Sequence, residues 1–271
     1  MVYFRNIDNE YFFRNFWNKK PFQFRAGVHA ELELSHLHNV VQSGIDYPNL
    51  RVLERGGALN PLFYTKSSTK ELSHEIDFDK FNGLDLNGKT VKLQGAFENF
   101  GDIGHLKNLF CKFFPDFKVS LNSYFSFGQS KGATPHYDFY HIFAHQIAGK
   151  KSWKIGPIID TNPVYGLCQN SIPDSLEYEY FETVPGDVIY IPPGAVHDVS
   201  ADSNSIHLAI GLNGQRVYEC IQQCIKDITI LNSSLRADFS PSFLSYEALN
   251  IQDFDKLFSL VKNEFIKKYY E

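Results

Sequence analysis

Short runs of alternating or continuously apolar residues follow one another between about residues 117 and 213. Runs of this length that are rich in β-branched and aromatic residues are typical of strands. Turn residues separate them, notably Gly149, Gly156-Pro157 and Pro185-Gly186. The pattern predicts a mainly β fold, a sandwich or barrel, with a double-stranded β-helix (jelly roll) over about 117–213 as the expected form. The predicted strands are 119–127, 136–147, 152–155, 177–183, 187–191 and 206–212.

Helical periodicity appears on both sides of this β region. Residues 9–18 and 102–114 repeat apolar side chains at helical spacing, with Asn9 as the expected cap of the first helix. After Gly214, residues 217–231 and 254–270 form two amphipathic stripes. We therefore expect one domain over 1–214 and a helical C-terminal region over 215–271. That region either packs on the jelly roll or serves as a dimerisation unit.

Composition narrows the setting of the protein. The 25 Phe and 15 Tyr favour a β-rich interior, and a net charge of −5 gives no overall basic field for nucleic acid. The four cysteines, which include Cys168, form no CxxC pair and are expected to be reduced thiols of a cytoplasmic protein. The N-terminal residues do not read as a signal peptide, and no apolar stretch is long enough for a membrane span.

Two histidines and one aspartate carry the candidate chemistry. His136 and Asp138 are two residues apart, so on a strand both side chains would point into one cavity. His197 follows on a second strand-like segment, after a Pro-Pro-Gly turn that begins at Pro192. Two imidazoles and a carboxylate make the facial triad that holds non-haem Fe(II) with open coordination positions. The competing ligands are His141, His145 and His207; His141 has the wrong parity to share the face of Asp138, and the other two are expected in the core or behind the ligands.

These residues resemble a known family. Gly186 to His197 resembles the second cupin motif, and 122–154 resembles the core of JmjC-type 2-oxoglutarate oxygenases. Within that core, the residues in register after Pro-His-x-Asp are Phe143, Gln146, Gly149, Lys151 and Trp153. The likeness is greatest to the cupin-like group of ribosomal oxygenases and asparaginyl hydroxylases, and Trp17 with Lys19-Lys20-Pro21 resembles the start of the ribosomal oxygenases.

The resemblance implies a set of cofactors and roles. His136, Asp138 and His197 would hold Fe(II), with 2-oxoglutarate as co-substrate and O2 as oxidant. Lys151 would pair with the distal carboxylate of 2-oxoglutarate. Asn122 and Tyr124, which share a strand face by parity, and Thr134 would help to hold the co-substrate. His141 stands where the family often has Asp or Asn near the substrate, and a helix-mediated homodimer is also implied.

The sequence leaves several functions open. The leading expectation is a dioxygenase that hydroxylates a C–H bond of a protein or peptide side chain. The alternatives are the same chemistry on a free amino acid or natural-product intermediate, N-methyl demethylation, and a metal-binding cupin without 2-oxoglutarate, such as an isomerase or a binding module. Lys151 in register with the metal motif argues against the last of these.

Overall fold

A computed structural model of the chain describes residues 3–4, 8–67, 74–98, 100–166, 171–231, 233–236 and 251–270. The chain forms two compact units, Met1–Asn213 and Gly214–Glu271. Cys168 lies outside the described residues, whereas Cys111, Cys220 and Cys224 are free thiols.

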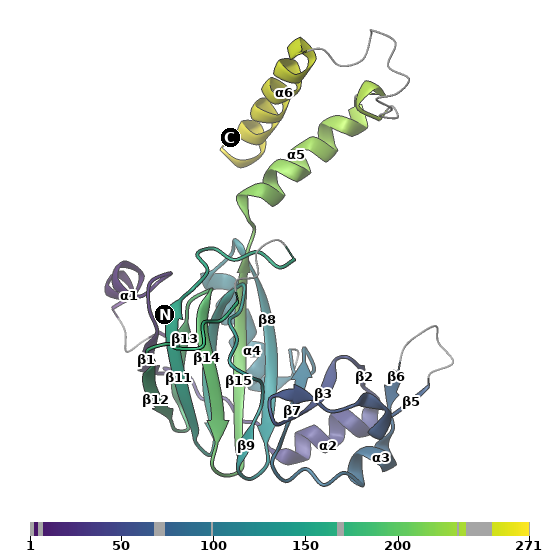
Figure 1. The fold of residues 1–271 in the computed structure, drawn as a ribbon, viewed down its shortest axis with the longest axis vertical. Helices are drawn as coiled ribbons and strands as arrows, with labels where there is room; N and C mark the ends of the chain where they lie inside the picture. Colours follow the sequence, from purple (N-terminus) through teal and green to yellow (C-terminus); the bar gives the residue numbers. More distant parts are fainter. Residues whose placement is uncertain are drawn as a thin grey trace. The chain divides into compact units, whose positions relative to one another are not determined.

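The first unit is built on eight strands that form a jelly roll (Figure 1). Four of them form the order β13-β10-β15-β8 within a large sheet, and the other four form the sheet β12-β11-β14-β9. This arrangement of two antiparallel sheets confirms the predicted mainly β, double-stranded β-helix fold. The strands are β8 (Phe117–Ser126), β9 (Ser130–Lys131), β10 (His141–Ala148), β11 (Lys151–Ile158), β12 (Glu179–Thr183), β13 (Asp187–Ile191), β14 (Ala195–Ala201) and β15 (Ser205–Gly214).

Strands from the first hundred residues extend the large sheet at both edges. β1 (Phe22–Arg25) pairs with β13, and β7 (Lys89–Gln94), β3 (Leu50–Glu54) and β4 (Gly57–Ala58) continue in that order from β8. A separate small sheet consists of β2 (Asp46–Tyr47), β6 (His74–Ile76) and β5 (Thr65–Ser67). The jelly-roll sheet is therefore continued by β7 and β3 beyond β8, and these two strands bring further side chains toward the site.

The helices of the first unit pack around its sheets together with aromatic side chains. They are α1 (Asn9–Asn15), α2 (Leu34–Ser43), η1 (Pro61–Phe63), α3 (Phe78–Asn82) and α4 (Gly101–Phe113). Phe12 of α1 and Phe110 of α4 both pack on Phe143 of β10, and all three side chains are fully buried. Burial of each such ring contributes roughly 1.5–3 kcal/mol, so this aromatic layer is a main source of the unit's stability.

The structure corrects some predicted boundaries. The first helix ends at Asn15, and its cap is Asp8, whose carboxylate accepts from the Tyr11 amide at 3.2 Å; Asn9 is the first helical residue instead. The strand predicted over 136–147 begins only at His141. His136 makes an isolated bridge with His197, because the chain after Pro135 crosses to the other sheet before it joins β10. Part of the predicted 177–183 run is also irregular, since β12 starts at Glu179.

The second unit contains α5 (Val217–Leu231), η2 (Ser233–Arg236) and α6 (Ile251–Tyr269), close to the predicted helices. Cys220, Cys224 and Ile228 of α5 are buried, and Lys268 of α6 forms an ion pair with Asp227 at 2.7 Å. The other side of the predicted α5 stripe is exposed, including Val217 at 68% and Leu231 at 89%. Among the described helices, none combines the length and apolar character needed to cross a membrane.

Candidate metal centre and co-substrate cavity

The three predicted ligands meet at one point of the first unit. Nε2 of His197 lies 3.5 Å from Oδ2 of Asp138, and Nε2 of His136 lies 3.9 Å from the same oxygen. One ligand atom from each residue lies within 4.8 Å of the others. Two imidazole nitrogens and a carboxylate oxygen at this spacing can share one metal ion, because each metal–ligand bond to a first-row ion is about 2.0–2.2 Å long.

The backbone orients both imidazole rings. Nδ1 of His136 lies 2.8 Å from the Thr134 carbonyl oxygen, and Nδ1 of His197 lies 3.2 Å from the Ala195 carbonyl oxygen. A ring that donates from Nδ1 keeps its lone pair on Nε2, which is the atom facing Asp138 in each case. Burial, and then the neighbouring His136, lower the pKa of His197, so this imidazole stays in the neutral form that binds metals.

The turn before β14 brings His197 and Asp138 together. The Gly194 amide donates to the Asp138 carbonyl oxygen at 3.0 Å. Gly194 has a φ of +77°, and a Cβ at this position would come 1.9 Å from the Asp160 carbonyl oxygen. Only glycine fits this close approach and this positive φ. Backbone hydrogen bonds between His136 and His197, at 3.1 and 2.7 Å, complete the link between the two ligand segments.

The ligands lie in the wall of a cavity of about 210 Å³. Alternate residues of the jelly-roll strands line it: Asn122 and Tyr124 from β8, Lys151 and Trp153 from β11, His197 and Val199 from β14. Residues i and i+2 of a strand face the same side, so each strand contributes its inner face to the cavity. The predicted metal site, Lys151, Asn122 and Tyr124 therefore share one chamber between the two sheets.

Lys151 is a buried cation without an anionic partner. Its side chain is 4% exposed, and Nζ donates to the Ser126 hydroxyl at 2.8 Å. Ser126 in turn contacts the Thr90 hydroxyl at 2.9 Å. Among the described residues, no carboxylate lies within ion-pair distance of Lys151, and burial lowers its pKa from 10.5 to about 7. A buried ammonium group in this state is poised to bind an anion that enters the cavity.

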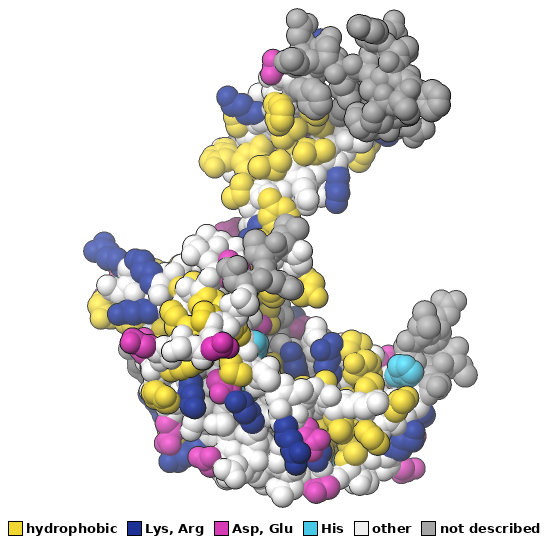
Figure 2. All heavy atoms as spheres, in the orientation of Figure 1, with side chains coloured by type: hydrophobic (Ala, Val, Ile, Leu, Met, Phe, Trp, Pro, Cys, Tyr) yellow, Lys and Arg dark blue, Asp and Glu magenta, His cyan; other side chains and the backbone are white. Residues whose placement is uncertain are grey.

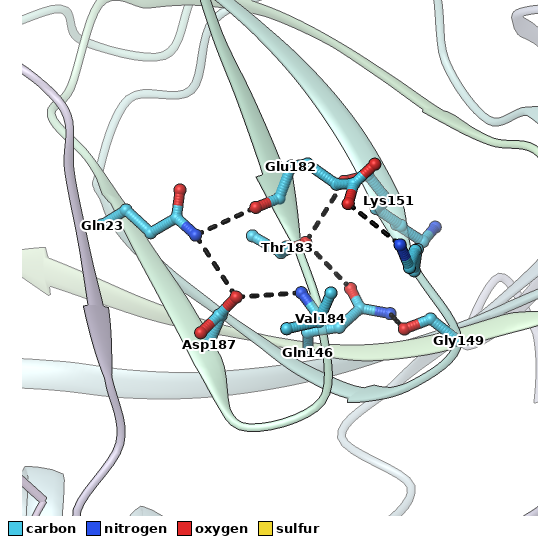
Figure 3. Close-up of polar contacts among 9 residues, drawn as sticks. Gln23, Gln146, Gly149, Lys151, Glu182, Thr183, Val184 and Asp187 are labelled. Atoms are coloured by element: carbon cyan, nitrogen blue, oxygen red, sulfur yellow. Dashed lines mark hydrogen bonds and ion pairs between the residues drawn. The ribbon is translucent and has the colours of Figure 1, made fainter.

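A buried polar network holds the start of β11, where Lys151 lies (Figure 3). The Thr183 hydroxyl lies 3.2 Å from the Gln146 side-chain oxygen and 3.4 Å from the Lys151 carbonyl oxygen, either of which can accept its one proton, and it accepts from the Trp153 indole at 3.0 Å. Gln146 also donates to the Gly149 carbonyl oxygen at 3.3 Å. This network anchors the turn and strand that position Lys151. It includes three residues of the same sequence motif: Gln146, Gly149 and Trp153.

The comparisons with known proteins agree with this geometry. The JmjC-domain profile matches residues 93–220. This stretch of the chain is a JmjC domain. The resemblance to JmjC-type, cupin-like oxygenases that the sequence predicted is confirmed. Ribosomal oxygenase 2 of Rattus norvegicus is 24% identical over 216 residues, 75% of this chain and 45% of that protein. The ribosomal protein uL16 3-hydroxylase of Escherichia coli is 31% identical over 96 residues, 33% of this chain and 24% of that protein.

Solved structures show the same fold as the JmjC domain and its flanking elements. Escherichia coli YcfD matches with a TM-score of 0.67 and 20% identity, over 99% of this chain and 70% of YcfD. YcfD described as a ribosomal oxygenase in complex with cobalt and 2-oxoglutarate matches with a TM-score of 0.63, also at 20% identity, over 97% of this chain and 68% of that one. This chain spans less than half the length of the two curated relatives, so its activity is argued below from the site itself.

The donor set of the JmjC domain fits the expected cofactors. Two neutral imidazoles and one carboxylate are the ligands of non-haem Fe(II) oxygenases, and they leave coordination positions open. Lys151, in the same cavity, offers a charge-assisted hydrogen bond to a carboxylate. The JmjC domain therefore has the residues for Fe(II) and for 2-oxoglutarate.

Of the other three residues predicted to hold the co-substrate, two line the cavity and one does not. Asn122 lines the cavity, and its buried side-chain oxygen has no hydrogen-bond partner within the described part of the chain. Tyr124 also lines the cavity and stacks on His207 at 4.5 Å between ring centroids. Thr134 is not among the residues that line the cavity; its backbone carbonyl orients His136. Its contribution in this structure is made by the main chain, which any residue type carries.

The three competing histidines lie in different surroundings. His141 stacks on Trp17 at 3.8 Å and contacts the Tyr190 hydroxyl through Nδ1 at 2.9 Å, in the aromatic layer, and it is not among the residues that line the cavity. His145 is in the core, where burial lowers its pKa from 6.5 to about 4. His207 lines the cavity, and burial and then Lys151 hold its pKa well below the ordinary value.

Sequence reasoning missed two cations and a tyrosine of the JmjC cavity. Arg51 of β3 and Lys92 of β7 line it from strands outside the jelly roll. Tyr140 lines it beside Asp138, and burial followed by the charge of Asp138 raises the pKa of Tyr140. Tyr140 could have been found, since it lies two residues after Asp138. Arg51 and Lys92 carry no such signal, because only the sheet order β8-β7-β3 brings them to the site.

Proposed function

We propose that this protein is an Fe(II)- and 2-oxoglutarate-dependent dioxygenase that hydroxylates a side chain of a protein or peptide. The observation that carries the proposal is Lys151, a buried cation without a carboxylate partner among the described residues, in the same cavity as His136, Asp138 and His197. A metal-binding cupin without 2-oxoglutarate would have no use for such a cation, whose burial is unfavourable until an anion arrives.

Each group has a distinct task in this proposal. His136, Asp138 and His197 hold the metal ion, and Lys151, with Asn122 and Tyr124 in the same wall, holds the co-substrate. Iron and 2-oxoglutarate supply the oxidation of a C–H bond by O2, with succinate and CO2 as by-products. The apolar side chains of Trp153 and Val199 line the cavity and exclude water from it. Lys151 contributes by orienting the carboxylate end of 2-oxoglutarate.

The substrate class rests on the relatives. One of the two curated relatives described above is named a ribosomal oxygenase, and the other is named a hydroxylase of a ribosomal protein. This supports a protein substrate and favours hydroxylation as the outcome. A different group of relatives is named as bifunctional lysine-specific demethylase and histidyl-hydroxylase, for example in Drosophila willistoni, at 28% identity over 128 residues. N-methyl demethylation is therefore an alternative outcome of the same oxidation.

The test is a turnover assay on the full chain with Fe(II), 2-oxoglutarate and O2. Succinate release that requires both iron and 2-oxoglutarate is expected, and a substrate screen should give products heavier by one oxygen atom. Formaldehyde release would instead indicate demethylation, and products from free amino acids or natural-product intermediates would indicate a small-molecule substrate. Absence of 2-oxoglutarate consumption by iron-loaded protein would refute the proposal and favour an isomerase or binding module.

We also propose that the second unit mediates a homodimer. On α5, Ile221 and Ile225 are 40% and 42% exposed, and on α6 Phe258 is 68% exposed. Figure 2 shows hydrophobic side chains gathered on these helices. Exposed apolar side chains that cluster on one surface mark interaction surfaces. Light scattering should give twice the chain mass at micromolar concentration, and Ile221→Asp combined with Phe258→Asp should reduce it to the monomer mass; a wild-type monomer would overturn this proposal.

A further inference from the structure

Two basic side chains face each other in the wall of the cavity. Arg51 of β3 is directly opposite Lys92 of β7 in the antiparallel register, and both line the cavity that holds the metal ligands. Like charges directly opposite each other on a sheet destabilise it. Among the described residues, neither side chain has an ion pair or a side-chain hydrogen bond; each only lies over a ring, Arg51 over Tyr47 and Lys92 over Tyr124.

The same two strands contain a natural comparison. Three positions along the ladder, Glu54 is opposite Lys89 on the other face of the strands, and their side chains form an ion pair at 3.1 Å. These strands thus carry a complementary pair away from the cavity and a like-charged pair within it. Burial is the first cause of a lowered pKa at Lys92; Asp138 opposes the shift, and Arg51 adds a smaller lowering. Lys92 is half-buried and Arg51 is exposed, so both cations of this wall are open to an anion that enters the cavity.

The position of this pair separates it from the anchor of the co-substrate. Thr90 is the ladder partner of Ser126, whose hydroxyl accepts from Lys151, and it precedes Lys92 by two residues on β7. Two residues along a strand correspond to about 7 Å. Lys92 is instead in the row of Tyr124, and the nearby Asp138 favours its charged form. When Asp138 holds a metal ion its negative charge is compensated there, which leaves Arg51 and Lys92 available to another anion.

We propose that Arg51 and Lys92 form a carboxylate-binding subsite that selects peptide substrates with an acidic residue close to the oxidised position. This inference rests on the proposed oxygenase function and names its substrate class. The guanidinium group of Arg51 can bind a carboxylate through two parallel hydrogen bonds, and Lys92 adds a point charge from the next strand. The same two cations repel a substrate that carries Lys or Arg at this place, so unmodified or methylated lysine is a poor target beside them.

The test measures binding of fluorescent peptide pools to the full chain loaded with Co(II) and 2-oxoglutarate. The pools share a random background and fix Glu, Gln or Lys at one position, and each is made with a free and an amidated C-terminus. We expect the Glu pool to bind about tenfold more tightly than the Gln pool, as one charge-assisted contact allows. Arg51→Gln and Lys92→Gln should each remove most of this preference. A preference that depends on the free C-terminus alone would overturn the assignment to an acidic side chain.

Lys89→Gln is the matched control, because it removes a cation from the same strand outside the cavity and should leave the preference intact. Arg51→Glu combined with Lys92→Glu should shift the preference to the Lys pool. Equal binding of the Glu, Gln and Lys pools by the parent protein, or a preference that survives both neutral variants, would overturn the inference. So would a tenfold rise in the 2-oxoglutarate requirement of both variants with an unchanged peptide preference, because the two cations would then serve the co-substrate.

Two further measurements keep the outcomes separate. Because Arg51→Gln removes a like-charge contact, we expect its melting temperature to be equal to or higher than that of the parent, which shows that lost binding is not lost folding. Iron-dependent succinate release by the parent with the peptide pools present, where a substrate C–H bond supplies the two electrons, tests the oxygenase function independently of the binding preference. If that release is absent, the proposed function fails, while peptide selection by charge still decides the subsite.

Discussion

Replacement of Lys151 by Met should have opposite effects on stability and on co-substrate binding. Lys151 is buried, donates to the Ser126 hydroxyl, and has no carboxylate partner among the described residues. A pKa lowered from 10.5 to about 7 corresponds to roughly 4–5 kcal/mol of unfavourable burial of the charge at neutral pH. Methionine has a similar length and no charge, so the variant avoids this cost.

The size of both effects follows from these contacts. If relaxation removes half of the burial cost, about 2 kcal/mol remains, and the melting temperature of the protein without co-substrate should rise by about 4–8 °C. In contrast, loss of a charge-assisted hydrogen bond of about 1.5–3 kcal/mol should weaken 2-oxoglutarate binding by roughly ten- to a hundredfold. Metal binding should persist, because Lys151 is not one of the three ligand residues.

Thermal melting and calorimetric titration of 2-oxoglutarate into the metal-loaded protein measure the two effects. Lys150→Met is the matched control, since its neighbouring side chain is 63% exposed and pairs with Glu182 at the surface. The control should change neither quantity by more than the scatter between preparations. A Lys151→Met variant that melts below the parent and still binds 2-oxoglutarate equally well would refute the assignment of Lys151 as the anchor.

Other measurements address the ligands, the pH dependence and the core. His136→Ala and Asp138→Ala should each lower bound iron and succinate release at least about a hundredfold, because one of three protein ligands is lost; near-normal turnover by either variant would contradict its role. Affinity for 2-oxoglutarate should fall as pH rises above 7, by up to about tenfold per pH unit, since neutral Lys151 must first take up a proton; a flat profile between pH 7 and 9 would argue against this. Burial lowers the pKa of His145 from 6.5 to about 4, so the unfolded chain binds more protons between these values and stability should fall by roughly 3 kcal/mol as pH drops through them; urea titrations at pH 7 and 4.5 should show a smaller loss in His145→Gln. Phe143→Ala should cost about 3–5 kcal/mol in the same urea assay, and a cost below 1 kcal/mol would mean that the aromatic layer closes over the gap.

Local patterns in the sequence predicted most of the jelly roll and the centre of the site. Short β-branched and aromatic runs identified strands such as Asp187–Ile191, and the turn glycines Gly149, Gly186 and Gly194 all have positive φ. Parity alone placed Asn122 and Tyr124 on one face, as found. The strand predicted at His136 is absent because its two hydrogen bonds go to His197, a partner distant in sequence.

The cavity residues that the sequence did not predict reach the site because of the order of the strands in the sheet. Arg51 and Lys92 enter the cavity only because β7 and β3 continue the sheet beyond β8. His207 has the same residue type and a similar apolar surrounding as His145, yet one lines the cavity and the other faces the aromatic core. One residue of register decides between these positions, and a single sequence does not encode that register in any short segment.

The backbone bridge between His136 and His197 gives the metal ion a second consequence, as a crosslink. Hydrogen bonds to the main-chain carbonyl oxygens of Thr134 and Ala195 orient the two rings, and the backbone pairing of His136 with His197 brings them together. An unfolded chain presents no such arrangement, and an ion that binds only the folded form stabilises it in proportion to the logarithm of its free concentration. A bound iron ion would link the segment before β10 to strand β14. The concentration of free iron would then affect the stability of the jelly roll as well as its proposed activity.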